Sequence, residues 1–148
     1  MDQNYLELLK YDKELKSQGK SFSKENMQNF RKFLRYEISL LDHFNWEQRD
    51  RYFLLMTNFL DKKITEDQYI DQLYKLYNEN KNLVEELKLN LEKLKKFKPN
   101  SASKEFSKLI ENLISDCRIF EPDPDLRCDD ELSETELVNE ARGIFLKM

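Results

Sequence analysis

The chain has 148 residues, of which 39% are hydrophobic and 36% are charged, and its formal net charge is −4. This is enough for one domain with a well-formed core, and no apolar run approaches the roughly 18 residues that a membrane-spanning helix needs. The opening residues 1–4 are polar and acidic, unlike a secretory signal. We therefore expect a single domain over residues 1–148, off the membrane, in the cytoplasm or in an organelle matrix such as a plastid stroma.

Two glycines and three prolines punctuate the whole chain, so helices with few breaks are expected almost throughout. The first break is at Ser23, which stands between Phe22 and Met27 as an N-cap with an apolar staple would. The next is at Asn45, which forms a possible capping box with Gln48. These signals predict helices over residues 2–16, 24–42 and 46–61.

The second half of the chain carries stronger helix-start signals. Thr65 with Gln68, and Ser133 with Glu136, form capping boxes that are each flanked by an apolar pair suited to a staple. A short loop is expected at residues 98–103, around Pro99. The predicted helices cover residues 66–96, with a possible bend at 78–82, then 104–120 and 134–147.

Apolar residues recur at three- or four-residue spacing within these segments, which is the pattern of one buried helix face. The second predicted helix shows it at Met27, Phe30, Leu34, Ile38 and Leu41. Narrow stripes with charge on the remaining circumference favour helices packed antiparallel through short connections. The predicted fold class is all-α, an antiparallel helical bundle with a four-helix-type core and additional N-terminal helices.

The most acidic surface of the chain follows the fifth predicted helix. Nine acidic residues and only two arginines lie in residues 116–136, and the segment opens with Phe-Glu-Pro-Asp-Pro-Asp at 120–125. A residue before proline avoids helix, so Glu121 and Asp123 should be extended and held outward. The same residues would also suit a merely solvated turn. The candidate partner-binding residues are Asp116, Glu121, Asp123, Asp125, Asp129 and Asp130.

Such a surface predicts a cationic partner, either a metal or a basic protein. A calcium loop counted from Asp123 fails, because Arg127 takes a ligand position and Cys128 stands where the sharp turn needs glycine. Zinc is disfavoured because Cys117 and Cys128 lack ligand spacing and His43 is the only histidine. We expect no metal site, no cofactor and no catalytic residues, because the chain has neither a nucleophile–histidine pattern nor a glycine-rich phosphate loop.

A lysine cluster marks the end of the long predicted helix, at Lys88, Lys93, Lys95, Lys96 and Lys98. Cations at a helix C-terminus complement the carbonyl end of the helix dipole. A nucleic-acid site would need a wider basic face, because phosphate contacts dominate such binding. The cluster is therefore interpreted as a solvated helix end, and no direct nucleic-acid binding is expected.

Residues from about 52 to 148 resemble the colicin D-type, bacterial self-protective immunity family. The first part of the resemblance is the helix end and stapled cap at 59–69. The more specific part is the Phe-Glu-Pro-Asp-Pro-Asp run at 120–125, with its acidic continuation and the terminal helix ending at 140–147. The resemblance implies that residues 52–148 form the bundle and that residues 1–50 are an N-terminal helical extension packed on it.

Members of this family bind the nuclease domain of a toxin and block it, with surface carboxylates in place of RNA phosphates. In the similar case the toxin is a ribonuclease that cuts transfer RNA in the anticodon loop. By position, Asp123 would be the acid presented after the proline turn and Glu121 its neighbour. Arg118 stands where the family has a toxin-facing acid, and Asp116 could compensate from the preceding turn. The alternative is a helical structural or adaptor protein that binds another basic protein and has no toxin partner.

Overall fold

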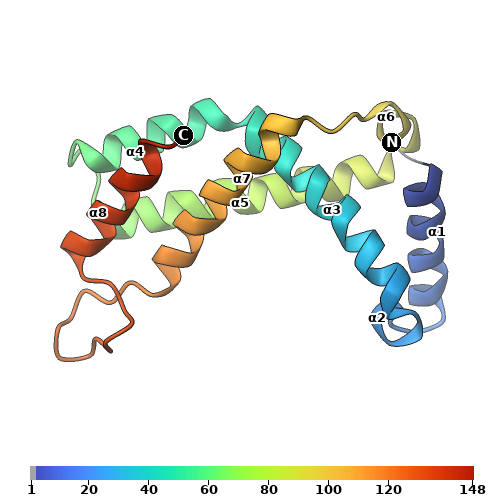
Figure 1. Ribbon diagram of the computed structural model, residues 1–148, viewed down its shortest axis with the longest axis horizontal. Coiled ribbons are helices and arrows are strands. Elements are labelled where there is room, and N and C mark those ends of the chain that lie inside the picture. Colours follow the sequence, from blue (N-terminus) through green and yellow to red (C-terminus); the bar gives the residue numbers. More distant parts are fainter. Residues whose placement is uncertain (1–2) are drawn as a thin grey trace.

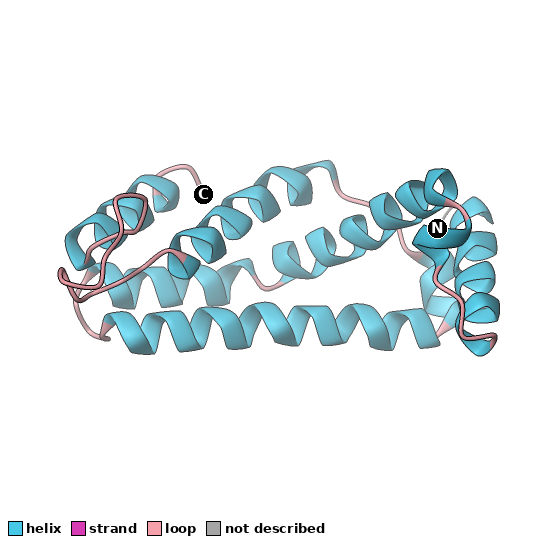
Figure 2. Ribbon diagram, turned by 90° about the horizontal axis from the view of Figure 1, so that it is seen from below, coloured by secondary structure: helices cyan, strands magenta, loops and turns pink. Residues whose placement is uncertain are grey.

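This computed structural model describes residues 3–148. Within them the chain forms eight helices joined by loops, and no strand (Figures 1 and 2). The expectation of an all-α fold is thus confirmed. Residue 2, where the first predicted helix begins, lies outside the described residues. The helices are α1 (Gln3–Ser17), α2 (Phe22–Glu25), α3 (Met27–Glu47), α4 (Arg49–Leu60), α5 (Glu66–Leu89), α6 (Leu91–Lys96), α7 (Ser101–Arg118) and α8 (Glu134–Phe145).

Two of the predicted helix starts are confirmed in detail. Thr65 caps α5 through the expected box with Gln68, and Ser133 caps α8 through the box with Glu136. The start predicted at Ser23 is wrong, because α3 begins later and is capped by Asn26, whose side chain accepts from the backbone of the third helical residue. Ser23 lies instead within the single turn of α2, whose first residue is buried in the core.

Three further boundary expectations need correction. Asn45 does not cap a helix, since α3 continues to Glu47 and buries the Asn45 side chain completely. α5 shows no bend at residues 78–82, and the break comes at Asn90, whose side chain caps α6. α7 begins at Ser101 and ends at Arg118, two to three residues earlier at each end than expected.

The buried side chains form two hydrophobic cores that divide the chain differently from a boundary at residues 50–52. One, here the bundle core, joins α4, α7 and α8 to the first half of α5. The other, here the N-terminal core, joins α1, α2 and most of α3 to the second half of α5 and to α6. α5 therefore contributes to both cores, and Figure 1 shows it running along most of the elongated molecule.

A buried polar network lies where the two cores meet. Asn45 of α3 donates to the Ser107 hydroxyl of α7 over 2.9 Å and accepts from the Tyr52 hydroxyl of α4 over 2.8 Å. Asn80 of α5 donates to Asn45 Oδ1 over 3.0 Å. These side chains are at most 2% exposed. The network thus joins four helices by directional hydrogen bonds. These bonds specify how the helices pack against one another more closely than apolar contacts alone would.

The apolar stripe predicted for α3 is only partly buried. Of its five residues, Phe30 and Leu41 are half-buried, whereas Met27, Leu34 and Ile38 are 49%, 40% and 57% exposed. The residues of α3 that enter the N-terminal core are Phe33 and Leu40, which the predicted stripe did not include. The reason is that α1, α5 and α7 contact α3 from sides that leave the three exposed residues uncovered. Among residues 3–148, no helix combines the length and apolar character needed to cross a bilayer.

Candidate functional site

The predicted acidic segment forms a loop between α7 and α8, here called the acidic loop (residues 119–133). It projects from one end of the bundle (Figure 1). Its two ends are joined by backbone bonds, because Leu132 N donates to Ile119 O over 2.7 Å and Glu121 N donates to Leu132 O over 2.9 Å. The loop therefore starts and finishes at one fixed point beside the ends of α7 and α8.

Side chains of the loop fix its backbone further. Asp123 Oδ1 accepts from the Asp125 amide over 2.9 Å, and a Glu121 carboxylate oxygen accepts from the Asp123 amide over 3.1 Å. Arg127 reaches back across the turn, with Nε donating to Glu121 O over 2.9 Å and Nη2 donating to Pro122 O over 3.1 Å. Arg127 thereby satisfies two carbonyl oxygens that lie outside any helix, and it adds to the backbone bonds that Leu126 N and Arg127 N donate to Asp123 O.

Four of the six predicted site residues are brought together on the exposed part of this loop. These are Asp123, Asp125, Asp129 and Asp130. Glu121 differs from the expectation of an outward carboxylate, because it is half-buried and its carboxylate turns back to the Asp123 amide. The Asp123 amide lies outside any helix, and the Glu121 carboxylate supplies the acceptor that it lacks.

Asp116 is not part of the loop surface. It lies half-buried on the last turns of α7, near Glu140 of α8. Burial, together with the nearby Glu140 carboxylate, raises the pKa of Asp116 above its ordinary value. Arg118, the last residue of α7, is exposed next to the loop. Asp116 and Arg118 thus both lie at the end of α7 and not on the loop itself.

The cysteine of the loop is poor in thiolate character. Glu131 accepts from the Cys128 amide over 2.7 Å. The hydrogen bond between the Glu131 carboxylate and the thiol raises the pKa of Cys128, with the negative charge of Glu131 as a second cause. The buried Cys117 on α7 has its pKa raised to about 12 by desolvation. Both sulfurs are free. In the described residues, no group of three or more His, Cys, Asp or Glu is placed to hold a metal ion.

Sequence reasoning missed two features of the loop. Arg127 was counted only as a charge and as a mismatch to a calcium loop, whereas it clamps the turn. Leu126 is 68% exposed between the acidic residues, so the loop presents an apolar side chain as well as carboxylates. The one available signal for the clamp was an arginine placed soon after two prolines that leave carbonyl oxygens without helical partners.

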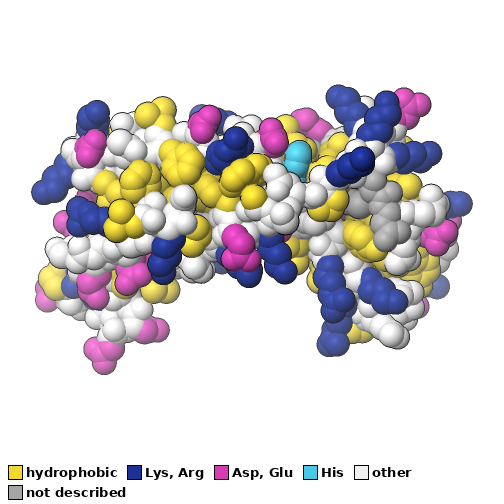
Figure 3. Space-filling view, turned by 45° about the horizontal axis from the view of Figure 1, so that its top comes forward, with side chains coloured by type: hydrophobic (Ala, Val, Ile, Leu, Met, Phe, Trp, Pro, Cys, Tyr) yellow, Lys and Arg dark blue, Asp and Glu magenta, His cyan; other side chains and the backbone are white. Residues whose placement is uncertain are grey.

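Acidic side chains concentrate on the projecting loop. Figure 3 shows Asp and Glu side chains there and a group of Lys and Arg side chains at the opposite end, with side chains of both charges over the rest of this face. Opposite charge at the two ends orients a charged partner before contact, because the potential acts over about a Debye length, roughly 8 Å at physiological ionic strength. The acidic loop is therefore a place to which cationic groups are attracted.

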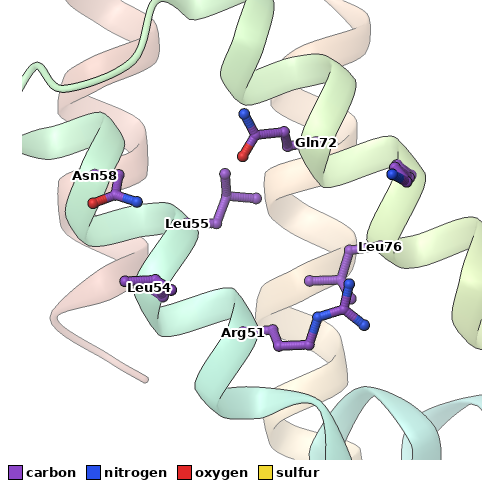
Figure 4. Close-up of a pocket in the computed structure, with 7 residues that line it drawn as sticks. Arg51, Leu54, Leu55, Asn58, Gln72 and Leu76 are labelled. Carbon is purple, nitrogen blue, oxygen red and sulfur yellow. The ribbon is translucent and has the colours of Figure 1, made fainter.

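A separate groove lies between α4 and α5, with a volume of about 480 Å³. Figure 4 shows Leu55 and Arg51 from α4 and Gln72 and Leu76 from α5 around it. Arg51 is engaged in an ion pair with Glu79 at 3.0 Å. None of the lining residues comes from the acidic loop, and the lining offers no carboxylate or imidazole for acid–base chemistry.

No protein-family model matches the chain, and neither a curated protein nor a solved structure is significantly similar to it.

Proposed function

We propose that this protein is an immunity-type inhibitor that binds the basic nuclease domain of a toxin through the acidic loop, without turnover. The target class is a ribonuclease of the transfer-RNA-cleaving kind, which the resemblance of residues 52–148 to the colicin D-type immunity family implies. The observation that carries the proposal is a set of exposed carboxylates on a loop whose backbone is fixed by its own hydrogen bonds.

The physical argument starts from the target. A nuclease binds phosphates with arginine, lysine and protonated histidine, so an array of carboxylates can occupy the same donors through charge-assisted hydrogen bonds. Charge complementarity raises the association rate and selects against acidic partners. The clamp by Arg127 and the two prolines limit the loop's freedom before binding, so less conformational entropy is lost on docking.

The loop's carboxylates have different roles in this proposal. The carboxylates of Asp125, Asp129 and Asp130 make no hydrogen bond or ion pair within the described residues, so both oxygens of each are available to a partner. Asp123 uses one oxygen on the Asp125 amide and keeps the other free. We therefore assign direct contacts mainly to the first three. Asp123 has a double role, since it holds the turn and adds charge.

The loop also supplies an apolar contact. Leu126 is 68% exposed among these acids, and burying a leucine side chain on binding contributes about 1.5–3 kcal/mol. A partner that fits would have a small apolar recess bordered by cationic groups. That combination distinguishes a shaped nuclease cleft from a diffuse basic surface.

The test begins with affinity capture from the native source. Wild-type protein is compared with a charge-reversal variant that carries Asp125→Lys, Asp129→Lys and Asp130→Lys. The control is Asp71→Lys, at an exposed residue of α5 outside the acidic loop. Proteins retained by wild type and by Asp71→Lys, and lost by the loop variant, are the candidate partners. Binding to each recovered partner is then measured, and we expect a loss of about 2–5 kcal/mol where a charge pair is buried at the interface.

Co-expression separates the two candidate functions. The recovered partner is expressed alone, with wild type and with the loop variant, and growth and transfer-RNA integrity are followed. The immunity proposal expects a toxic partner that wild type neutralises and that the loop variant does not. If the partner is not toxic, or if the loop variant binds it as well as wild type does, the immunity proposal is rejected in favour of the adaptor alternative.

A further variant, Asp123→Asn, keeps the oxygen that accepts from the Asp125 amide. It therefore tests the loss of one negative charge without the loss of this hydrogen bond in the turn.

A further inference from the structure

A second surface, at the end of the molecule opposite the acidic loop, combines an apolar floor with a cationic rim. It is a groove of about 550 Å³ between α3, the end of α5 and α6, here called the lysine-rimmed groove. Its volume lies within the usual range of small-molecule sites, roughly 300–1,000 Å³. Figure 3 shows the single histidine of the chain, His43, between hydrophobic side chains and a group of Lys and Arg side chains at this end.

Aromatic rings that pack against one another form part of the floor of the groove. The His43 ring meets Phe97 edge-on with centroids 4.9 Å apart and Phe44 with centroids 5.2 Å apart. Phe97 is only 8% exposed and belongs to the N-terminal core, so its ring is held by packing. Leu83 and Leu87 of α5 complete the apolar lining. A preformed apolar floor of this kind favours an aliphatic or aromatic ligand body.

His43 offers one polar group to the groove. Its Nδ1 is buried and makes no hydrogen bond with the described residues. An N–H at that position would be buried and unsatisfied, which costs more than an unpaired lone pair, so the neutral ring carries its proton on Nε2. The half-buried ring therefore presents an N–H donor on its accessible edge, above the apolar floor.

The rim carries an excess of positive charge. Lys93, Lys96 and Lys98 line the groove, are exposed, and form no ion pair with any residue from 3 to 148. Glu86 is the only carboxylate in the lining. In a chain of net charge −4, three unpaired cations around one apolar groove are a local reversal of sign. Such a rim attracts an anionic head group.

We propose that the lysine-rimmed groove binds a small amphiphilic carboxylate, with its acyl or aromatic body on the floor formed by Phe44, Leu87 and Phe97. Its head group accepts from His43 Nε2 and from the ammonium groups of the rim. The site is independent of the acidic loop and of its proposed partner, because no residue of one lines the other. An anionic head group on an acyl body also occurs in phospholipids, where the anion is a phosphate diester, so the test distinguishes the free carboxylate from a lipid surface.

The experiment is a titration of the full chain with sodium decanoate, followed by the ¹H–¹⁵N signals of the imidazole. His43 is the only histidine, so these signals need no assignment. We expect saturable one-to-one binding with a shift of the Nε2 resonance. Acetate has the head group without the body, and decyltrimethylammonium has a similar body with the opposite charge; neither should produce the shift. The variant Lys93→Gln with Lys96→Gln and Lys98→Gln should bind decanoate about tenfold more weakly, as the sum of three exposed charge contacts.

The matched control changes the same number of exposed lysines elsewhere, as Lys75→Gln with Lys104→Gln and Lys147→Gln. It should bind decanoate as the wild type does. Equal affinity in the rim variant, equal binding of decyltrimethylammonium, or an unmoved His43 signal would each overturn the proposal. Binding to phosphatidylglycerol vesicles without binding to monomeric decanoate would also overturn it, in favour of a lipid surface.

Discussion

The guanidinium of Arg127 donates from Nε to the backbone carbonyl of Glu121 over 2.9 Å, across the base of the acidic loop. The only basic residue inside the acidic stretch of the loop is thus used on the backbone rather than on the neighbouring carboxylates. The contact closes the turn of residues 121–127 while leaving the exposed acids unpaired. It thus ties the backbone of the turn together against the mutual repulsion of the acidic side chains.

Replacing Arg127 by Gln should loosen the acidic loop without unfolding the bundle. Two hydrogen bonds from a charged, half-buried donor are lost, so we expect a local effect of about 1–2 kcal/mol. The measurement is amide hydrogen exchange, where the Asp125 and Leu126 amides should exchange about tenfold faster or more. The control is Arg142→Gln, which changes an exposed arginine of α8 outside the loop. Unchanged exchange in the loop would show that the prolines alone hold it.

Replacing Asn45 by Ala should strongly destabilise the protein. The change leaves the Tyr52 hydroxyl, the Ser107 hydroxyl and the Asn80 amide without their shared partner in a fully buried place. We expect the free energy of unfolding to fall by about 2–4 kcal/mol, measured by urea titration. Asn139→Ala on the exposed face of α8 is the control and should change it by less than about 0.5 kcal/mol. Similar losses in the two variants would contradict a role for the network.

Replacing Asp116 by Asn should stabilise the protein at neutral pH. The raised pKa means that the folded protein binds this proton more tightly than the unfolded chain. The contribution of Asp116 to stability is therefore fully present at low pH and is lost as the pH rises through the folded-state pKa. The gain at pH 7 should be below about 1 kcal/mol, because the side chain is only half-buried.

Unfolding titrations of this variant at several pH values give the check. Wild type and Asp116→Asn should agree in acid, where the carboxyl is protonated in both states, and diverge towards neutral pH. Glu140→Gln should give a smaller gain, since it removes the second cause of the shift and leaves the desolvation. A variant that is less stable than wild type at pH 7 would show that the Asp116 charge has a favourable partner instead.

Two substitutions on α3 separate the exposed face of this helix from its buried one. Ile38→Ala should change the free energy of unfolding by less than about 0.5 kcal/mol, because Ile38 is 57% exposed. Leu40→Ala should lower it by about 2–5 kcal/mol, because Leu40 is fully buried in the N-terminal core. Thermal and urea unfolding of the two variants measure the difference. A large loss for Ile38→Ala would mean that this face is covered in solution.

Local chemistry was readable along the chain. The capping boxes at Thr65 and Ser133 each need only two residues that are three positions apart, so they do not depend on the rest of the fold. Both capping boxes are present. The helix predicted over residues 104–120 is present as α7, and its apolar face, including Ile110 and Leu113, is buried. The acidic loop was placed between the correct helices, because two prolines and a capping box leave little freedom for its boundaries.

Properties that depend on neighbours distant in the sequence were not readable. Asn45 looks like a cap in isolation, and only the approach of α4, α5 and α7 gives its amide partners inside the core. The stripe on α3 gives a helix with an apolar face, but which part of that face is covered depends on the helices that surround it, and Ile38 remains exposed. The orientation of Asp116 is decided in the same way by the position of α8.

The sequence by itself determined the all-helical class, two well-formed caps and the place of the acidic loop, because these depend on contacts within a few residues. The tertiary structure alone decided the division into two cores and the buried polar network. It also decided that Glu121 and Arg127 hold the loop rather than face outward. Packing and long-range hydrogen bonds select among several arrangements that the same helical periodicity allows, and this selection is made only when the helices meet.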